Sequence, residues 1–251
     1  MDAFYQILIY ALVGFIAQLI DGALGMAYGV SSTTFLTVAG VSPKIASASV
    51  HTAEVFTTLA SGLSHWKAKN IDWKIFGRLV IPGVIGGALG AYVLVNVPGD
   101  IIGPFVSVYL LIMGAVVLIR AFKGVTGKLL SAGKLIPVGL AGGFLDAIGG
   151  GGWGPIVTST MVASGHPPRY TIGSVNTAEF FVTIVQTLTF TMFLSIGDYW
   201  RVILGLAVGG VIAAPLAAWL CKKIPEKNMM IVVGVLIILL NVRSIIMLFL
   251  K

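Results

Sequence analysis

Four carboxyl groups stand in apolar stretches of the sequence, where an acid is costly. Asp21 and Asp146 lie at the ends of apolar stretches, whereas Glu54 and Glu179 lie well inside theirs. A carboxylate at membrane depth costs roughly 2.5–3.5 kcal/mol or more unless it is protonated, paired or hydrated. Such groups can carry protons or build a polar substrate pocket. The structural alternative is a neutral acid that hydrogen-bonds between helices.

A histidine shares a helical face with one of these acids. His51 precedes Glu54 by three residues, so a helix would place both side chains on one side. The pair could carry a proton, or the histidine could be a packed hydrogen-bonding group. The corresponding residue in the second half of the chain is Asn176, which does not titrate near neutral pH. Thr52 and Thr177 are pocket candidates, although threonine also bonds its own helix backbone.

Glycine-rich segments follow the two aspartates and predict breaks in the helices. The run Gly149–Gly152 disfavours a helix, because each glycine costs about 1 kcal/mol relative to alanine. Non-helical backbone is tolerated at membrane depth only where it lines a cavity or is buried in protein. The N-terminus of the following helix presents unpaired N–H groups that favour an anion. We therefore expect two hairpin tips to face one central anion site.

The candidate residues follow from these patterns. Tyr28 and Trp153 coincide when the two halves are aligned, and they could wall the site or lie at the membrane interface. The alternative for the glycines is close helix packing, as we expect for Gly83, Gly86, Gly87 and Gly90. The substrate-binding candidates are Gln18, Asp21, Gly22, Gly25, His51, Thr52, Asp146, Gly150, Gly151, Gly152, Trp153, Asn176 and Thr177. The proton-coupling candidates are Glu54, Glu179 and His51.

The composition indicates that these residues belong to helices in a lipid membrane. Of 251 residues, 57% are hydrophobic and only 10% are charged, and the mean hydropathy is +1.01. Soluble domains carry about 25% charged residues. The sequence therefore predicts an all-α polytopic membrane protein in a lipid bilayer. Ten apolar segments are expected at 4–20, 24–40, 44–65, 75–96, 101–122, 135–148, 153–165, 169–196, 199–221 and 228–250.

The chain repeats itself at a shift of 125 residues. Asp21 then coincides with Asp146, and residues 49–56 coincide with 174–181, where six of eight positions are identical. Apolar composition alone does not align Asp and Thr-Ala-Glu in the same order, so we infer two five-segment repeats. The predicted organisation is a first repeat over 1–122, a polar cytoplasmic linker over 123–134 and a second repeat over 135–251.

Five segments per repeat places the second repeat upside down relative to the first. Basic residues test this prediction, because they concentrate in cytoplasmic loops. With both termini outside the cytoplasm, twelve Lys or Arg residues fall on the cytoplasmic side and four on the other. Inverted repeats are typical of secondary transporters with alternating access. Segments 1–2 and 6–7 are expected to be short hairpins that meet inside the membrane.

Several other classes of protein find little support. The net charge of +7 comes from residues between apolar runs, so we interpret it as a topology signal and not as a nucleic-acid surface. The single cysteine, Cys221, excludes an internal disulfide or a cysteine-cluster metal site. No metal or other cofactor is expected. Signatures of serine hydrolases and zinc proteases are absent, which disfavours an intramembrane enzyme. The sequence is also compatible with an anion channel in place of a transporter, and with a homodimer.

The paired motifs resemble those of the TauE/SafE family of sulfite and organosulfur-anion exporters. The resemblance rests on residues 21–29 and 49–54 and on their second-half versions, 149–155 and 174–179. It covers nearly the whole chain. It implies a multi-pass inner-membrane secondary transporter, driven by an ion gradient and without an ATPase domain. The resemblance implies export of a small sulfur-containing anion such as sulfite or a sulfonate. From the acids inside the apolar segments we expect this transport to be coupled to protons.

Overall fold

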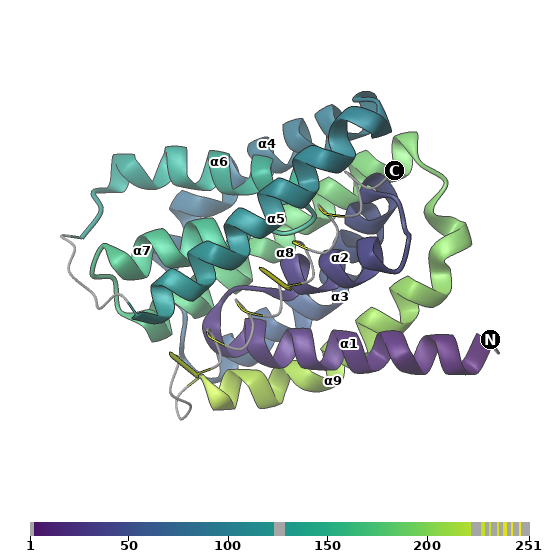
Figure 1. The fold of residues 1–251 in the computed structure, drawn as a ribbon. Coiled ribbons are helices and arrows are strands. Elements are labelled where there is room, and N and C mark those ends of the chain that lie inside the picture. Colours follow the sequence, from purple (N-terminus) through teal and green to yellow (C-terminus); the bar gives the residue numbers. More distant parts are fainter. Residues whose placement is uncertain are drawn as a thin grey trace.

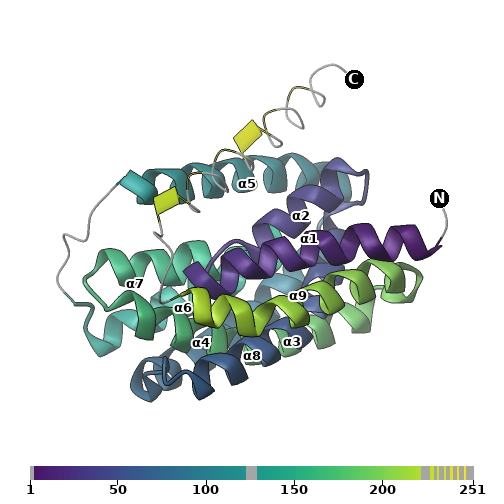
Figure 2. The ribbon, with the colours of Figure 1, turned by 90° about the horizontal axis from the view of Figure 1, so that it is seen from below.

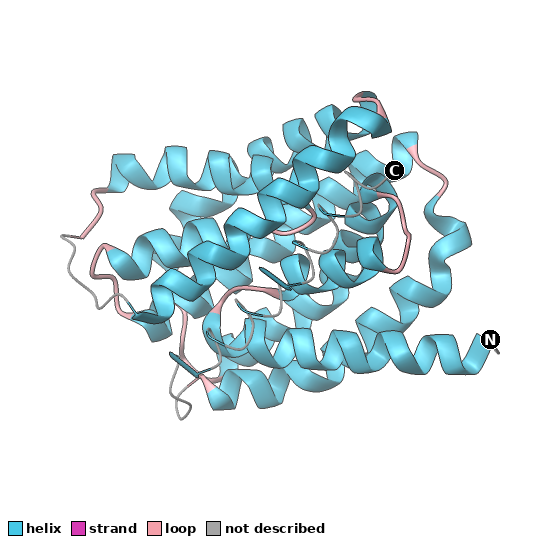
Figure 3. Cartoon of the chain, in the orientation of Figure 1, coloured by secondary structure: helices cyan, strands magenta, loops and turns pink. Residues whose placement is uncertain are grey.

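The computed structural model describes residues 3–122 and 129–221, together with isolated positions between 227 and 246. Within these residues all regular secondary structure is helical, as Figure 3 shows. The fold class predicted from the sequence is therefore confirmed. The tenth expected segment, 228–250, lies largely outside the described residues.

The helices follow the expected segments with differences at their ends. They are α1 Ala3–Leu24, α2 Tyr28–Val38, α3 Pro43–Lys67, α4 Trp73–Asn96, α5 Gly99–Phe122, α6 Ala132–Gly149, α7 Ser159–Ala163, α8 Pro168–Phe193 and α9 Trp200–Leu220. A π-helical turn, Gly154–Thr158 (η1), leads into α7, and a short 3-10 helix, Ile196–Tyr199 (η2), precedes α9.

Local sequence explains where several helices begin. Pro43 and Pro168 stand in the first turns of α3 and α8, where a missing N–H costs nothing. Asp72 caps α4, because its carboxylate accepts hydrogen bonds from the N–H groups of Lys74 at 2.8 Å and Ile75 at 3.3 Å. These residues explain why α3, α4 and α8 begin where they do.

The expectation that both arms of each hairpin are short was wrong for the first arms. At 1.5 Å per residue, the 22 residues of α1 span about 33 Å and the 18 residues of α6 span about 27 Å. Helix α1 continues past Asp21 to Leu24, and the Asp21 side chain is buried in its last turn. Only the returning arms, α2 and the pair η1–α7, are short.

Many large apolar side chains face outward, and many polar side chains are buried. Four helical stretches of the described residues are long and apolar enough to cross a membrane, namely α1, α4, α6 and Ile196–Leu220. Large apolar side chains such as Phe4, Ile81 and Ile212 are exposed, whereas His51 and Gln186 are completely buried. A soluble protein would show the reverse arrangement, so this distribution fits a protein whose solvent is lipid.

The helices of the two halves pack in matching pairs. Helix α1 packs along α9, α6 packs along α4, and α3 packs against α8, as Figures 1 and 2 show. The first helix of each half therefore packs on the fourth helix of the other half. This exchange is the arrangement expected of two equivalent repeats, and the predicted domain boundaries stay a prediction. Orientation across the membrane stays a prediction.

Glycines allow these helix pairs to approach closely. A Cβ atom on Gly86 or Gly90 of α4 would run into the backbone of α6, at Leu140 and Phe144 respectively. A Cβ atom on Gly209 of α9 would likewise meet the backbone of α1 at Ala11. The packing role expected for the α4 glycines is thus visible at Gly86 and Gly90.

Candidate functional site

The two hairpin tips meet each other at the centre of the helix bundle. The first tip is the turn 25–27 between α1 and α2, and the second is the turn 150–153 between α6 and η1. The Thr158 hydroxyl donates to the Gly25 carbonyl at 2.7 Å, and the Thr33 hydroxyl donates to the Gly150 carbonyl. Both donors and both acceptors correspond at the 125-residue shift, so the two bonds are reciprocal.

Left-handed backbone shapes both tips. Gly25 has φ of 69° and Gly150 has φ of 67°, a region that glycine enters readily and other residues rarely adopt. The tips also lie in close contact, because a Cβ atom on Gly29 would lie 2.6 Å from the Gly151 Cα atom. The glycine-rich segments therefore serve both the turn and the tip-to-tip contact.

An aspartate of the same hairpin caps each returning arm. One carboxylate oxygen of Asp146 accepts from the N–H groups of Gly152 at 2.8 Å and Trp153 at 3.0 Å. The matching bond in the first half runs from the Tyr28 N–H to Asp21 at 3.4 Å. In this conformation an internal carboxylate therefore occupies helix N-terminal donors that we expected to meet an anion. The acids and the anion would compete for the same positive helix end.

His51 links the first Thr-Ala-Glu segment to the second hairpin. Its Nδ1 atom lies 2.6 Å from the Glu54 carboxylate, and its Nε2 atom lies 3.2 Å from the Asp146 carbonyl oxygen. The Asp146 carboxylate lies 3.9 Å from Nδ1. The predicted pairing of His51 with Glu54 on one helical face is present, and the structure adds Asp146 to the group.

The second half makes a different set of bonds with its matching residues. Asn176 donates to the Ser61 hydroxyl at 3.1 Å, and Gln186 donates to the Asp146 carboxylate at 2.8 Å. Ser61 and Gln186 correspond at the 125-residue shift, as do His51 and Asn176. The two halves thus share positions but not chemistry, because the histidine that contacts Glu54 in the first half is replaced by Asn176 in the second.

The four acids identified in the sequence are all buried. The exposed fractions of Asp21, Glu54, Asp146 and Glu179 are 3%, 2%, 2% and 5%. Asp21, Glu54 and Glu179 each interact electrostatically with other members of the four. Among the described residues, no buried Lys or Arg balances these groups. Full ionisation would therefore leave a large uncompensated negative charge, which the low-dielectric interior strongly disfavours.

Some buried polar atoms of the site have no hydrogen-bond partner within the described protein. Both amide atoms of Gln18 are in this state, and so are the Asn176 carbonyl oxygen and the Ser49 hydroxyl. Buried polar groups are normally satisfied, and exceptions occur where a ligand, ion or water binds. Gln18 and Asn176 therefore remain suitable for contact with a polar substrate.

Other predicted site residues bond within the protein scaffold. The Thr52 and Thr177 hydroxyls donate to the carbonyls of Ala48 and Gly173 one turn earlier in their own helices. Trp153 is fully buried and its indole N–H donates to Val175 at 3.1 Å. Tyr28 is also buried, so neither aromatic side chain is exposed to the surroundings of the protein. Gly22 lies beside Gln18, since its Cβ position is 3.2 Å from the amide nitrogen.

Several residues that shape the site were not predicted from the sequence. Thr33 and Thr158 match at the 125-residue shift, so the repeat itself could have indicated them. A second missed feature is a hydrogen-bonded chain from the first hairpin to a surface loop. His65 lies 3.0 Å from the Gly22 carbonyl, Asn70 contacts His65 at 3.0 Å, and Arg169 donates to Asn70 at 2.6 Å.

An apolar exterior, a polar buried centre and two interlocked hairpin tips define a polytopic helical membrane protein of the transporter class. Comparison with known families extends this assignment. The family model described as sulfite exporter TauE/SafE matches residues 10–244, and the chain belongs to this family.

A bacterial relative is also described as a membrane transporter. The chain is 45% identical over 249 residues to the probable membrane transporter protein YtnM of Bacillus subtilis (strain 168), covering 96% of this chain and 83% of the relative. No solved structure gives a significant match. The descriptions of the family and the relative confirm the prediction of a membrane transporter and not an enzyme.

Proposed function

We propose that the protein is a secondary transporter of a small sulfur-containing anion, such as sulfite or an organosulfonate, and that it moves protons together with the anion. The observation that carries this proposal is the cluster of four buried carboxyl groups beside the interlocked hairpin tips. The family description supplies the substrate class. The substrate-binding region comprises Gln18, Asn176 and the two tips, with export as the proposed direction.

The charge of the centre supports the coupling of anion and proton. Because the described interior holds four acids and no buried Lys or Arg, an anion entering beside ionised carboxylates would meet strong repulsion. Protonation of Glu54 and Glu179 would lower this repulsion by neutralising two of the four acids. Two ligands that each favour the binding of the other are thermodynamically coupled, so anion and proton are expected to move in the same direction.

The reciprocal tip contacts support alternating access. Each hairpin contributes one hydroxyl and one carbonyl to the contact, through Thr33 and Gly150 and through Thr158 and Gly25. Related halves of this kind supply two nearly equivalent conformations that open to opposite sides. Movement of one hairpin would release its contacts with the other tip. Separation of the two arms of that hairpin would in addition release the aspartate cap and free helix N-terminal N–H groups for the anion.

A flux screen in proteoliposomes tests the proposal. The purified protein is reconstituted and assayed with sulfite, thiosulfate, taurine, sulfoacetate and simple carboxylates, with and without an imposed pH gradient. We expect saturable flux of at least one sulfur anion that responds to the gradient. Unitary currents in bilayer recordings would instead indicate a channel, and flux of none of the sulfur anions would contradict the proposed substrate class.

A further inference from the structure

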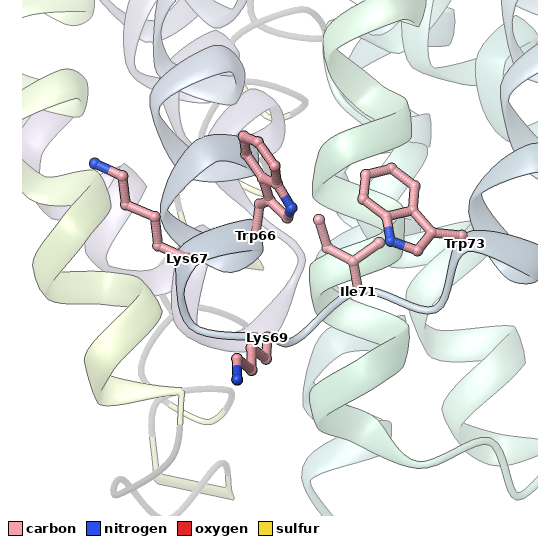
Figure 4. Close-up of a pocket in the computed structure, with 5 residues that line it drawn as sticks. All are labelled: Trp66, Lys67, Lys69, Ile71 and Trp73. Carbon is pink, nitrogen blue, oxygen red and sulfur yellow. The ribbon is translucent and has the colours of Figure 1, made fainter.

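The loop between α3 and α4 forms a pocket that the transport mechanism does not use. The pocket has a volume of about 560 Å³ and is lined by Trp66, Lys67, Lys69, Ile71 and Trp73. Figure 4 shows the two indole rings on either side of Ile71, with the lysine ammonium groups directed away from the rings. The pocket therefore combines an apolar wall with two lysines at its edge, at one end of the helix bundle.

An apolar groove continues from this pocket along the bundle. It has a volume of about 180 Å³, lies between α3 and α8, and shares Trp66, Ile71 and Trp73 with the pocket. Its remaining wall is almost entirely apolar and includes Leu59 and Phe181, whose side chains are 42% exposed. The combined shape has a cationic end and an apolar channel, which matches the two parts of a phospholipid.

Hydrogen bonds from α8 hold the loop in this shape. Arg169 donates to the Asn70 side chain at 2.6 Å and to the Ala68 carbonyl at 2.9 Å. The Ser174 hydroxyl accepts from the Asp72 N–H at 2.8 Å. Lys69 has a left-handed backbone with φ of 56°, a conformation that a lysine adopts only when the surroundings stabilise it. The pocket is therefore built into the fold.

The charges around the pocket favour an anionic ligand. Lys74 and Arg78 add to the charge of Lys67 and Lys69, and all four side chains are exposed. The nearby acid, Asp72, is engaged in capping α4. Among the described residues, the lining of the pocket and of the groove contains no Asp or Glu. Tryptophan and lysine together at the end of a membrane helix are typical of the lipid headgroup region.

We propose that this pocket and groove bind one anionic phospholipid, with its phosphate headgroup at Lys67 and Lys69 and an acyl chain along the α3–α8 groove. Basic pockets between membrane helices on the cytoplasmic side bind anionic headgroups, and the basic-residue bias predicts that this loop lies on that side. The lipid would bridge α3 and α8, the two helices that carry the Thr-Ala-Glu segments.

Native mass spectrometry of the detergent-purified protein tests the charge component. The probes are palmitoyl-oleoyl phosphatidylglycerol and palmitoyl-oleoyl phosphatidylcholine. We expect preferential retention of phosphatidylglycerol, and about fivefold weaker binding for each of Lys67→Gln and Lys69→Gln. Lys134→Gln, which removes an exposed lysine elsewhere on the predicted cytoplasmic side, is the matched control. Equal affinity for both lipids, or equal loss in the control, would overturn the proposal.

A groove variant separates a lipid from a simple anion. Leu59→Trp fills the groove and should weaken retention of phosphatidylglycerol, whereas Leu8→Trp on the exposed face of α1 should not. Inorganic phosphate serves as the headgroup-only competitor. If Leu59→Trp leaves phosphatidylglycerol binding unchanged while millimolar phosphate displaces the lipid, the site recognises a bare anion and the proposed acyl-chain groove is wrong.

Discussion

At the scale of single residues, the site combines matched positions with unmatched chemistry. Thr33 and Thr158 make the same contact in both halves, and Asp21 and Asp146 make the same cap. His51, however, corresponds to Asn176, so the two glutamates have different surroundings. We infer that Glu54 and Glu179 contribute unequally to proton movement, with Glu54 coupled to the histidine.

Replacing His51 with asparagine tests this inequality. The His51→Asn variant removes the partner that lies 2.6 Å from Glu54. Hydrogen bonds to charged groups contribute about 1.5–3 kcal/mol, so we expect anion flux to fall by about 10- to 100-fold, with a shifted pH profile. The measurement is flux at several pH values. His166→Asn in the loop before α8 is the matched control, and a wild-type pH profile in His51→Asn would contradict the inference.

At the scale of elements, close helix pairing depends on glycine seams. Helices α4 and α6 approach so closely that Gly86 has no room for a side chain, because a Cβ atom would meet the Leu140 carbonyl. Gly77, on the same helix, has no neighbouring atom within 4 Å of its Cβ position. The two glycines therefore differ in packing although both belong to α4.

Alanine substitutions distinguish these two positions. Gly86→Ala should destabilise the protein by about 1–3 kcal/mol through overpacking. Gly77→Ala should be neutral or stabilise the helix by up to about 1 kcal/mol, because alanine has the higher helix propensity. Thermal or denaturant unfolding in detergent measures both effects. Equal stability of the two variants would show that the α4–α6 contact is not as close as described.

At the scale of the whole molecule, the two ends of the bundle differ in charge. The beginning of α6 and the α3–α4 loop, with Lys67 and Lys69, lie at one end, and the N-terminus lies toward the other (Figures 1 and 2). The basic-residue bias predicts that the first end faces the cytoplasm. Both termini are then expected outside it.

Cysteine labelling in intact cells tests this orientation. In a Cys221→Ser background, Gly197→Cys should react with an impermeant maleimide added outside, whereas Lys69→Cys should react only after the membrane is opened. Gly197 suits this purpose because its Cβ position has no neighbouring atom within 4 Å. The reverse labelling pattern would invert the predicted topology.

The sequence predicted the buried acids and the hairpin tips because both carry a clear energetic cost in a membrane. A carboxyl group such as Asp146 and the non-helical run Gly149–Gly152 are both unfavourable in contact with lipid, so they require a protein interior. The repeat marks Thr33 and Thr158 as matched positions, but it does not predict their partners across the tips, because a membrane threonine bonds its own helix equally well. The aspartate caps were missed because an internal carboxylate and a bound anion use the same helix N-terminal donors.

The most direct test of coupled transport is simultaneous recording of anion and proton movement into proteoliposomes. The substrate is the best sulfur anion of the flux screen, used at a pH where its own charge is constant. We predict that protons accompany the anion in the same direction in the wild type and in the surface control Asp198→Asn. The Glu54→Gln/Glu179→Gln double variant should lose the accompanying proton. Undiminished proton movement in the double variant would contradict the account.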